Sequence, residues 1–314
     1  MDSNYILAQR KNDLMNDILN QIKQNYKNGD ILTRLIFINV GIYFSIVTLQ
    51  ILFGLFTVVE VNKVNEAIEE YLSFPSNHLE QVPYRFHTII THMFLHIEFS
   101  HIFSNMLMLY YLGKIFLSYF TPKRFFGLYI LGGLVGLLLL EFIVGVSPKH
   151  VDPIPAYGAS AAVMAIVIAI CTYVPKTEVR PFGLFSIKLM YLGIGIFLLD
   201  YLFLMKENTG GHIAHLGGAG TGYFFATAQK KGKDITKGVN YIISRIVNLF
   251  KVRSKMKVVY SQDNVQKMSD DEYNKNKSYS QKEIDKILDK ISASGYESLS
   301  KKEKKDLYNF SNKK

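Results

Sequence analysis

Tryptophan is absent from this 314-residue chain, and cysteine occurs once, at Cys171 inside an apolar run. A single cysteine can form neither an intrachain disulfide nor a zinc site built on several thiolates, so a metal ion would depend on histidine and carboxylate ligands alone. The pattern of a signal peptide is missing as well, because the first 30 or so residues are polar. We therefore expect no cleavable leader, and the first apolar segment should itself direct membrane insertion.

Apolar residues make up 49% of the chain, with 22 Phe and 20 Tyr, and they gather in long runs. The formal net charge is +10, but the Lys and Arg residues flank these runs or lie in the C-terminal tail. They do not form a basic stripe interleaved with aromatic residues, which is typical of a nucleic-acid surface. The pattern predicts a protein of the lipid bilayer and no nucleic-acid partner.

Six apolar segments are predicted to be membrane-spanning helices. They are residues 35–59, 100–120, 125–146, 158–174, 183–205 and 211–228. The expected fold is an all-α membrane protein, a bundle of six transmembrane helices with a small helical tail in the cytoplasm. The chain divides into a cytoplasmic N-terminal segment (1–33), a six-helix domain (34–228), a basic membrane-proximal segment (229–260), and a flexible linker with a short helical tail (261–314).

Basic residues predict the orientation of these helices. The short loops at residues 121–124 and 175–181 and the segment after residue 228 are rich in Lys and Arg. The loops on the opposite side carry few basic residues, and these are spread over much more chain. Because cytoplasmic loops are enriched in Lys and Arg, both termini are predicted to be cytoplasmic.

Two regions outside the six segments have patterns of their own, and so does the tail. Residues 60–99 are too long for a turn and too irregular for a span, so we expect a structured loop with an interfacial or re-entrant part. Residues 235–259 carry apolar side chains at helical spacing among basic ones, which fits a helix on the inner leaflet and equally a solvated spacer. In the tail, a capping box of Ser300 and Glu303 predicts a helical hairpin around Gly295.

Polar side chains inside apolar segments are costly, which makes each one a functional candidate. The first cluster is His92, His96, His101 and Asn105. The last two open the second span four residues apart, so they would share a helix face and could offer donors to an oxyanion. The same residues could equally form hydrogen bonds between helices, and His92 with His96 could hold a metal ion.

The second and third clusters carry a hydroxyl and an imidazole. Ser160 follows Gly158 where a loop opens the fourth span, which lets the backbone approach closely and leaves free amides near the serine oxygen. His212 and His215 open the sixth span. Each cluster alone is a weak signal, because Gly, Ser and His also serve as packing and hydrogen-bonding residues in membrane helices.

Small residues connect the helices that carry these two clusters. They recur every four residues, at Ala161, Ala165 and Ala169 in the fourth span and at Ala214, Gly218, Gly222 and Ala226 in the sixth. Such repeats permit close packing, so Ser160 and His215 are predicted to lie within hydrogen-bond reach, the minimum needed to activate a serine. We favour this Ser-His dyad, and we assign Asp200 in the fifth span a structural or ion-pairing role. Glu141 is expected at the membrane interface.

Together the three clusters resemble the motifs of the rhomboid family of intramembrane serine proteases. The matching residues are His92-x3-His96-x4-His101-x3-Asn105, Gly158-x-Ser160 and Ala214-His215-x2-Gly218-x3-Gly222, in this order on the second, fourth and sixth spans, within about residues 34–228. The resemblance implies a six-helix bundle with a water-filled cavity and no metal or cofactor. It implies that Ser160 is the nucleophile and His215 the general base, and that Asn105, His101 and the Ser160 amide meet the oxyanion.

The chain departs from the family pattern in two places. Ala161 stands where many members have glycine, and Met164 stands where some members have an aromatic residue that packs on the catalytic histidine. The pair Tyr84-Arg85 resembles an aromatic-arginine pair whose role in the family is structural. His212 lies outside the family's Ala-His-x-x-Gly frame, so we treat it as secondary.

The resulting hypothesis is a serine endopeptidase that cuts single-span membrane proteins in or beside the bilayer through an acyl-enzyme. Two other classes stay open. A catalytically inactive relative would bind membrane helices without cutting them, and a transporter or channel would use the buried histidines and Asp200 along a polar path. A transporter is disfavoured because the two halves of the chain show no repeat. The sequence does not predict an oligomeric state.

Overall fold

The computed structural model describes residues 15–16, 20–21, 23–57, 60–76, 78–146, 155–183, 185–204, 208–250 and 284–311. The chain divides into two compact units, Met1–Lys251 and Val252–Lys314. Each unit is described by itself.

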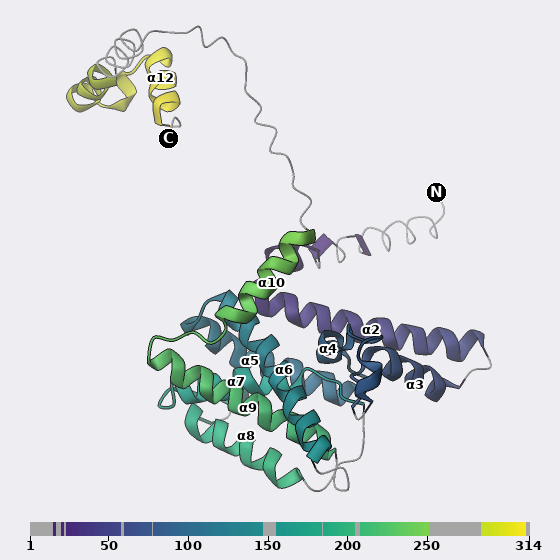
Figure 1. The fold of residues 1–314 in the computed structure, drawn as a ribbon. Helices are drawn as coiled ribbons and strands as arrows, with labels where there is room; N and C mark the ends of the chain where they lie inside the picture. The colour runs from purple at the N-terminus through teal and green to yellow at the C-terminus, as the bar shows by residue number, and fades with distance from the viewer. Residues whose placement is uncertain are drawn as a thin grey trace. The chain divides into compact units, whose positions relative to one another are not determined.

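Six long helices of the first unit lie at the predicted positions (Figure 1). They are α2 (Ile31–Phe56), α5 (Phe99–Tyr119), α6 (Pro122–Val146), α7 (Ser160–Tyr173), α8 (Leu189–Phe203) and α9 (Thr209–Lys230). By length and composition, α2 and α6 are long and apolar enough to cross a membrane, and α7 and α8 are shorter apolar helices. Each of the six predicted segments therefore overlaps one helix, and two of these helices have the length and composition of a membrane span.

The fifth helix begins later than the prediction, which started it at residue 183. Instead, β1 (Glu178–Val179) and β2 (Ile187–Lys188) form a short antiparallel hairpin around the 3-10 turn η3 (Pro181–Gly183). Proline cannot continue a helix, and Gly183 has a left-handed backbone with φ of 73°. Helix α8 therefore starts at Leu189, after the hairpin.

Helix α7 forms the centre of the bundle, and ten of its fourteen residues are buried. A Cβ added to Gly218 of α9 would lie 2.1 Å from the carbonyl oxygen of Ala161, and one added to Gly222 would lie 2.3 Å from that of Ala165. Only glycine permits so close an approach of two helix backbones. The predicted packing of the small-residue repeats is confirmed.

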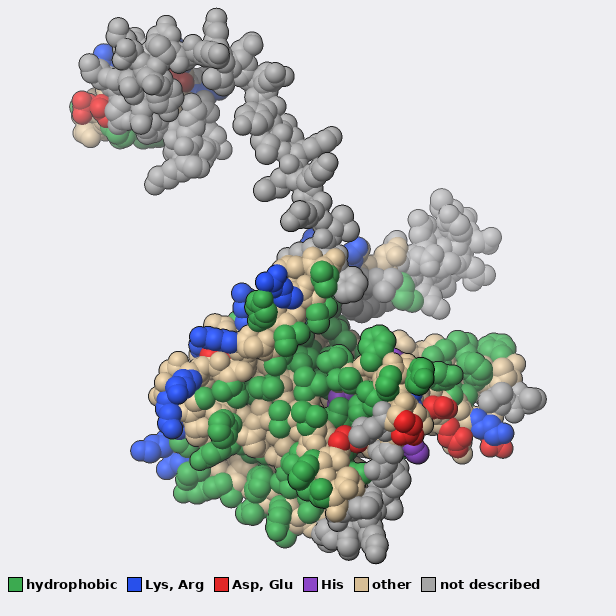
Figure 2. All heavy atoms as spheres, viewed as in Figure 1, with side chains coloured by type: hydrophobic (Ala, Val, Ile, Leu, Met, Phe, Trp, Pro, Cys, Tyr) green, Lys and Arg blue, Asp and Glu red, His purple; other side chains and the backbone are tan. Residues whose placement is uncertain are grey.

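Helix α8 lies at the edge of the bundle, and only Leu189 and Gly193 among its residues are buried. An apolar cavity of about 680 Å³ lies between α8 and the pair α7 and α9, lined by residues such as Cys171 and Tyr223. Exposed apolar side chains cover much of α2 and α8, and they are part of the hydrophobic surface in Figure 2. Hydrophobic surfaces of this extent are typical of contact with lipid or with another protein.

The segment between α2 and α5 is structured, as predicted. It contains α3 (Val61–Leu72), the 3-10 turn η1 (Leu79–Gln81), α4 (Thr88–Thr91) and the 3-10 turn η2 (His92–Phe94). Phe74 forms a backbone bridge with Ala156, and the Ser76 hydroxyl donates to the Glu141 carboxylate at 2.6 Å. Arg85 donates hydrogen bonds within the segment itself. The segment is therefore attached to the chain that leads into α7.

Helix α10 (Lys237–Phe250) follows α9 and contacts α6, so of the two alternatives left open for residues 235–259 the structure has the helix over 237–250. A Cβ on Gly127 would lie 2.6 Å from the side-chain amide nitrogen of Asn240, and Arg124 donates to the Asp234 carboxylate at 3.0 Å. Burial alone would raise the pKa of Asp234, but hydrogen bonds and the nearby guanidinium lower it. These contacts attach α10 to the six-helix body.

The second unit is the predicted helical hairpin. Residues 284–294 form one helix, and α12 (Lys301–Ser311) follows after Gly295, with φ of 75°, and the 3-10 turn η4 (Tyr296–Ser298). In the capping box the Ser300 amide donates to the Glu303 carboxylate at 2.7 Å, and the Glu303 amide donates to the Ser300 hydroxyl at 3.3 Å. The linker predicted at 261–282, residues 251–259 and most of the N-terminal segment lie outside the described residues.

Candidate active site at the start of helices α7 and α9

Ser160 is the first residue of α7, and the chain before it is held by two histidines. Gly158 has φ of 118°, a backbone conformation that side chains rarely permit, and its amide donates to the His92 carbonyl at 2.8 Å. The Ala159 amide donates to Nε2 of His96 at 3.3 Å. The turn therefore presents the serine at a helix start, where the first amides have no partner in their own helix.

His96 can accept this hydrogen bond because its ring is neutral. Burial, together with the nearby His101, lowers the pKa of His96 to about 4. His92 and His96 do not share a helix face, since η2 ends at Phe94 and the chain then becomes extended. Nδ1 of His92 instead bonds to the Thr88 carbonyl at 2.8 Å. In this structure both histidines hold the backbone of the loop.

His101 and Asn105 lie on the first turns of α5, as predicted. A Cβ on Gly158 would lie 2.8 Å from Nε2 of His101 and 3.8 Å from Oγ of Ser160, so the imidazole and the hydroxyl border the same space. The side-chain amide of Asn105 donates to the His101 carbonyl at 3.0 Å and lies 3.4 Å from Nε2 of His96. Both partners belong to histidines that lie beside the turn leading to Ser160.

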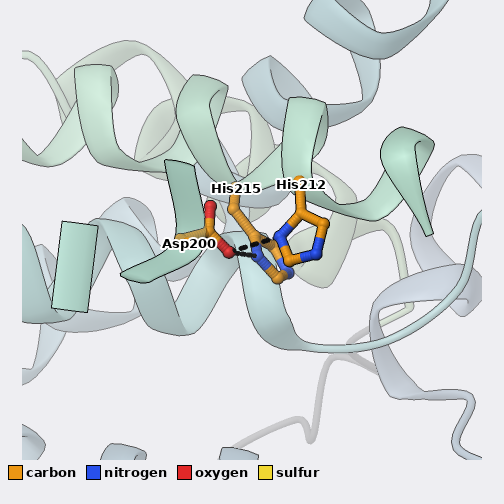
Figure 3. A group of neighbouring side chains, drawn as sticks. All are labelled: Asp200, His212 and His215. Atoms are coloured by element: carbon orange, nitrogen blue, oxygen red, sulfur yellow. Dashed lines mark hydrogen bonds and ion pairs between the residues drawn. The ribbon is translucent and has the colours of Figure 1, made fainter. Parts of the chain in front are cut away.

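Figure 3 shows a third group of side chains, in which Asp200 of α8 faces two histidines of α9. Oδ1 of Asp200 lies 2.6 Å from Nδ1 of His215 and 2.7 Å from Nδ1 of His212. The two rings meet edge to face, with centroids 5.6 Å apart. His101 lies within electrostatic range of His215, which links this group to the space beside Ser160.

The contact between Asp200 and His215 is the feature that sequence reasoning missed. The role expected for Asp200 is structural or ion-pairing, and in the structure its carboxylate accepts a hydrogen bond from the predicted general base. The positions of these residues relative to the ends of α8 and α9 could have indicated the contact. Asp200 lies three residues before the end of α8, and His212 lies three residues after the start of α9, so an antiparallel hairpin of the two helices brings them to one level.

These three residues are also the candidate metal ligands of the described part of the chain. Their ligand atoms all lie within 4.8 Å of one another. A tetrahedral Zn²⁺ with bonds of about 2.05 Å would hold its ligand atoms about 3.3 Å apart. The separations of 2.6 Å and 2.7 Å are instead those of hydrogen bonds between a carboxylate and imidazole N–H groups.

Ser160 and His215 lie beside the point where α6, α7 and α9 meet. A Cβ on Gly136 of α6 would lie 2.7 Å from Cβ of Ala161 and 2.6 Å from the carbonyl oxygen of Ala214. The residue after the serine and the residue before the histidine thus contact the same glycine. No hydrogen bond joins Ser160 to His215 among the described residues, and catalytic hydrogen bonds often form only with substrate bound.

The apolar helices favour a location in a membrane, and the polar cluster at their ends brings together side chains of a serine-bearing and a histidine-bearing helix. Residues 83–231 match the family model of the rhomboid domain, and this match supports membership of the rhomboid family. Residues 268–313, which include the helical hairpin, match a family of unknown function (DUF6576). A comparison with curated proteins found no match.

Proposed function

We propose that the protein is an intramembrane serine endopeptidase, which hydrolyses peptide bonds in or near transmembrane segments through an acyl-enzyme. The observation that carries the proposal is the meeting of Ala161 and Ala214 at Gly136, because it brings the neighbours of Ser160 and His215 together. Membership of the rhomboid family supports the same reaction. No metal or cofactor is needed for it.

In the proposed reaction, Oγ of Ser160 attacks the scissile carbonyl carbon while Nε2 of His215 takes the hydroxyl proton. The carbonyl electron pair moves to oxygen, and the resulting oxyanion accepts hydrogen bonds from Asn105, His101 and the Ser160 amide. When the tetrahedral intermediate collapses, the C–N bond breaks and the imidazolium returns its proton to the leaving amine. Water then cleaves the acyl-enzyme by the same steps, with His215 again as the base.

The proposed topology has six membrane spans and both termini in the cytoplasm. The distribution of charge supports it, since Lys and Arg gather where α9 ends and α10 begins, and acidic residues gather around α3 (Figure 2). On this topology α3 and the site around Ser160 lie toward the outer face. The exposed apolar residues of α10, among them Ile242 and Leu249, would rest on the inner leaflet.

The proposed substrate is a single-span membrane protein. A membrane helix hides its carbonyl groups in its own hydrogen bonds, so a segment must unwind locally before Ser160 can attack. Substrates with small or helix-weakening residues near the outer face are therefore expected.

The test is cleavage of a tagged single-span substrate by the full-length protein purified in detergent, followed by mass spectrometry of the products. Wild type should cut within or beside the substrate's apolar segment, and a fluorophosphonate probe should label it. Ser160→Ala should abolish both signals and leave the thermal unfolding midpoint unchanged. Cleavage that survives Ser160→Ala would reject the nucleophile. A wild type that binds substrate helices but neither cuts nor takes up the probe would be the inactive relative.

A further inference from the structure

We infer that Asp200 is a positioning residue for His215. Its carboxylate holds the imidazole in the tautomer that carries the proton on Nδ1, which leaves Nε2 free to accept the proton of Ser160. The inference rests on the function proposed above. It adds to the Ser-His pair a third residue, contributed by the neighbouring helix α8.

The hydrogen-bonding capacity of the groups determines the tautomer. An ionised carboxylate can only accept, so at 2.6 Å from Oδ1 the Nδ1 atom of His215 must be the donor. The neutral ring then has its lone pair on Nε2, the position needed in a general base. Without Asp200 the two tautomers would be closer in energy, and part of the population would present an N–H to the serine.

The Asp200 carboxylate is buried, and its hydrogen bonds are to the two histidines. The Asp200 side chain is 9% exposed, and its second oxygen, Oδ2, is buried and has no hydrogen-bond partner among the described residues. A buried charge is costly unless it is paired, and both of its pairings run through Oδ1 to Nδ1 of His212 and His215. His212 thus helps to fix the carboxylate, which in turn fixes the catalytic ring.

The charge of Asp200 also matters during the reaction. After His215 has taken the serine proton it becomes an imidazolium, and the adjacent carboxylate stabilises this positive charge inside a partly buried site. Met164 stands where some family members have an aromatic residue against the catalytic histidine. The hydrogen bond from His215 to Asp200 supplies a different means of holding the ring in this chain.

The experiment compares wild type, Asp200→Asn, Asp200→Glu and His212→Ala as full-length proteins with the same tagged substrate. Asn has nearly the shape of Asp, but its NH₂ group can donate to Nδ1 and so favours the wrong tautomer. We expect Asp200→Asn to lower kcat by about 10²-fold to 10⁴-fold with KM nearly unchanged, and to slow fluorophosphonate labelling in parallel. His212→Ala keeps the bond from His215 to Asp200, so it should lose less than about tenfold.

A matched control on α8 is Tyr201→Phe, whose exposed side chain lies one residue from Asp200 and should leave kcat unchanged. If Asp200→Asn proves unstable, Asp200→Glu keeps the carboxylate and should recover part of kcat. An unchanged kcat in Asp200→Asn, a rise in KM alone, or a folded but fully inactive Asp200→Glu would overturn the inference. In each of these cases Ser160→Ala still abolishes cleavage, so the proposed function survives. A wild type without cleavage or labelling would refute both.

Discussion

Gly218→Ala should damage catalysis more than it damages folding. The added methyl group would lie 2.1 Å from the carbonyl oxygen of Ala161, whereas ordinary contact begins at 3.4 Å. Helices α7 and α9 would therefore have to separate by about 1.3 Å, the difference between these distances. Ala161 follows Ser160 directly, so the hydroxyl would move away from His215 by a similar amount. A misplacement of about 1 Å costs about 10²-fold in rate.

The expected change in stability is smaller. Overpacking of this kind costs about 1–3 kcal/mol, and replacing glycine by alanine within a helix returns about 1 kcal/mol. The free energy of unfolding should thus fall by no more than about 2 kcal/mol, so most molecules should stay folded. The assay pairs the cleavage rate of the tagged substrate with the thermal unfolding midpoint in the same detergent.

Gly220→Ala is the matched control, because it lies on the same helix and a Cβ there would meet nothing within 4 Å. It should keep the wild-type rate, and its midpoint should be unchanged or slightly higher. If Gly218→Ala behaves like Gly220→Ala in both measurements, the two helices do not approach as closely as the structure has them. If Gly218→Ala unfolds outright while Gly220→Ala does not, the effect is on folding and the catalytic argument fails.

Two further predictions concern the turn before the serine and the tail. Gly158→Ala adds a methyl group 2.7 Å from the ring of His101 at a φ of 118°, so this variant should lose both activity and stability. The control Gly183→Ala also has a positive φ but open space around it, so thermal unfolding should show a loss of only about 1 kcal/mol. Equal losses in the two variants would refute the packing argument. Hydrogen bonds from the Ser300 amide and hydroxyl, with a nearby lysine, lower the pKa of Glu303 from 4.5 to about 2. The stabilisation by the capping box should therefore be complete above pH 4.5 and lost as the pH falls toward 2. A Ser300 amide NMR shift in the full chain that titrates at 4.5 would contradict this prediction.

The pattern of hydrophobic and small residues was sufficient to predict the helices and the packing of the two that matter most. Apolar runs located all six helices, because a helix buried in lipid or protein leaves a continuous apolar signal. The four-residue repeats of Ala and Gly predicted the contact of α7 with α9, which Gly218 and Gly222 confirm. The capping box at Ser300 and Glu303 was also correct, since it depends on residues only three positions apart.

The contacts that the sequence did not reveal join distant segments or depend on irregular backbone. The pairing of Asp200 with His215 joins two different helices and depends on how α8 and α9 lie against each other. Helix α3 was not predicted, because its mixed acidic sequence lacks the long apolar run used to locate the other helices. The role of His96, which accepts the Ala159 amide, depends on a loop that no periodicity describes.

The three helices around Gly136 touch through main-chain atoms and methyl groups, so a larger side chain at this junction would have to move a helix. A side-chain substitution cannot change a main-chain contact without moving a helix, so substitutions at this junction should disrupt the reactive centre. The exposed apolar surfaces of α2 and of α8, apart from Asp200, have few such constraints. Substitutions on these exposed surfaces should therefore be tolerated with little effect on the junction of α6, α7 and α9.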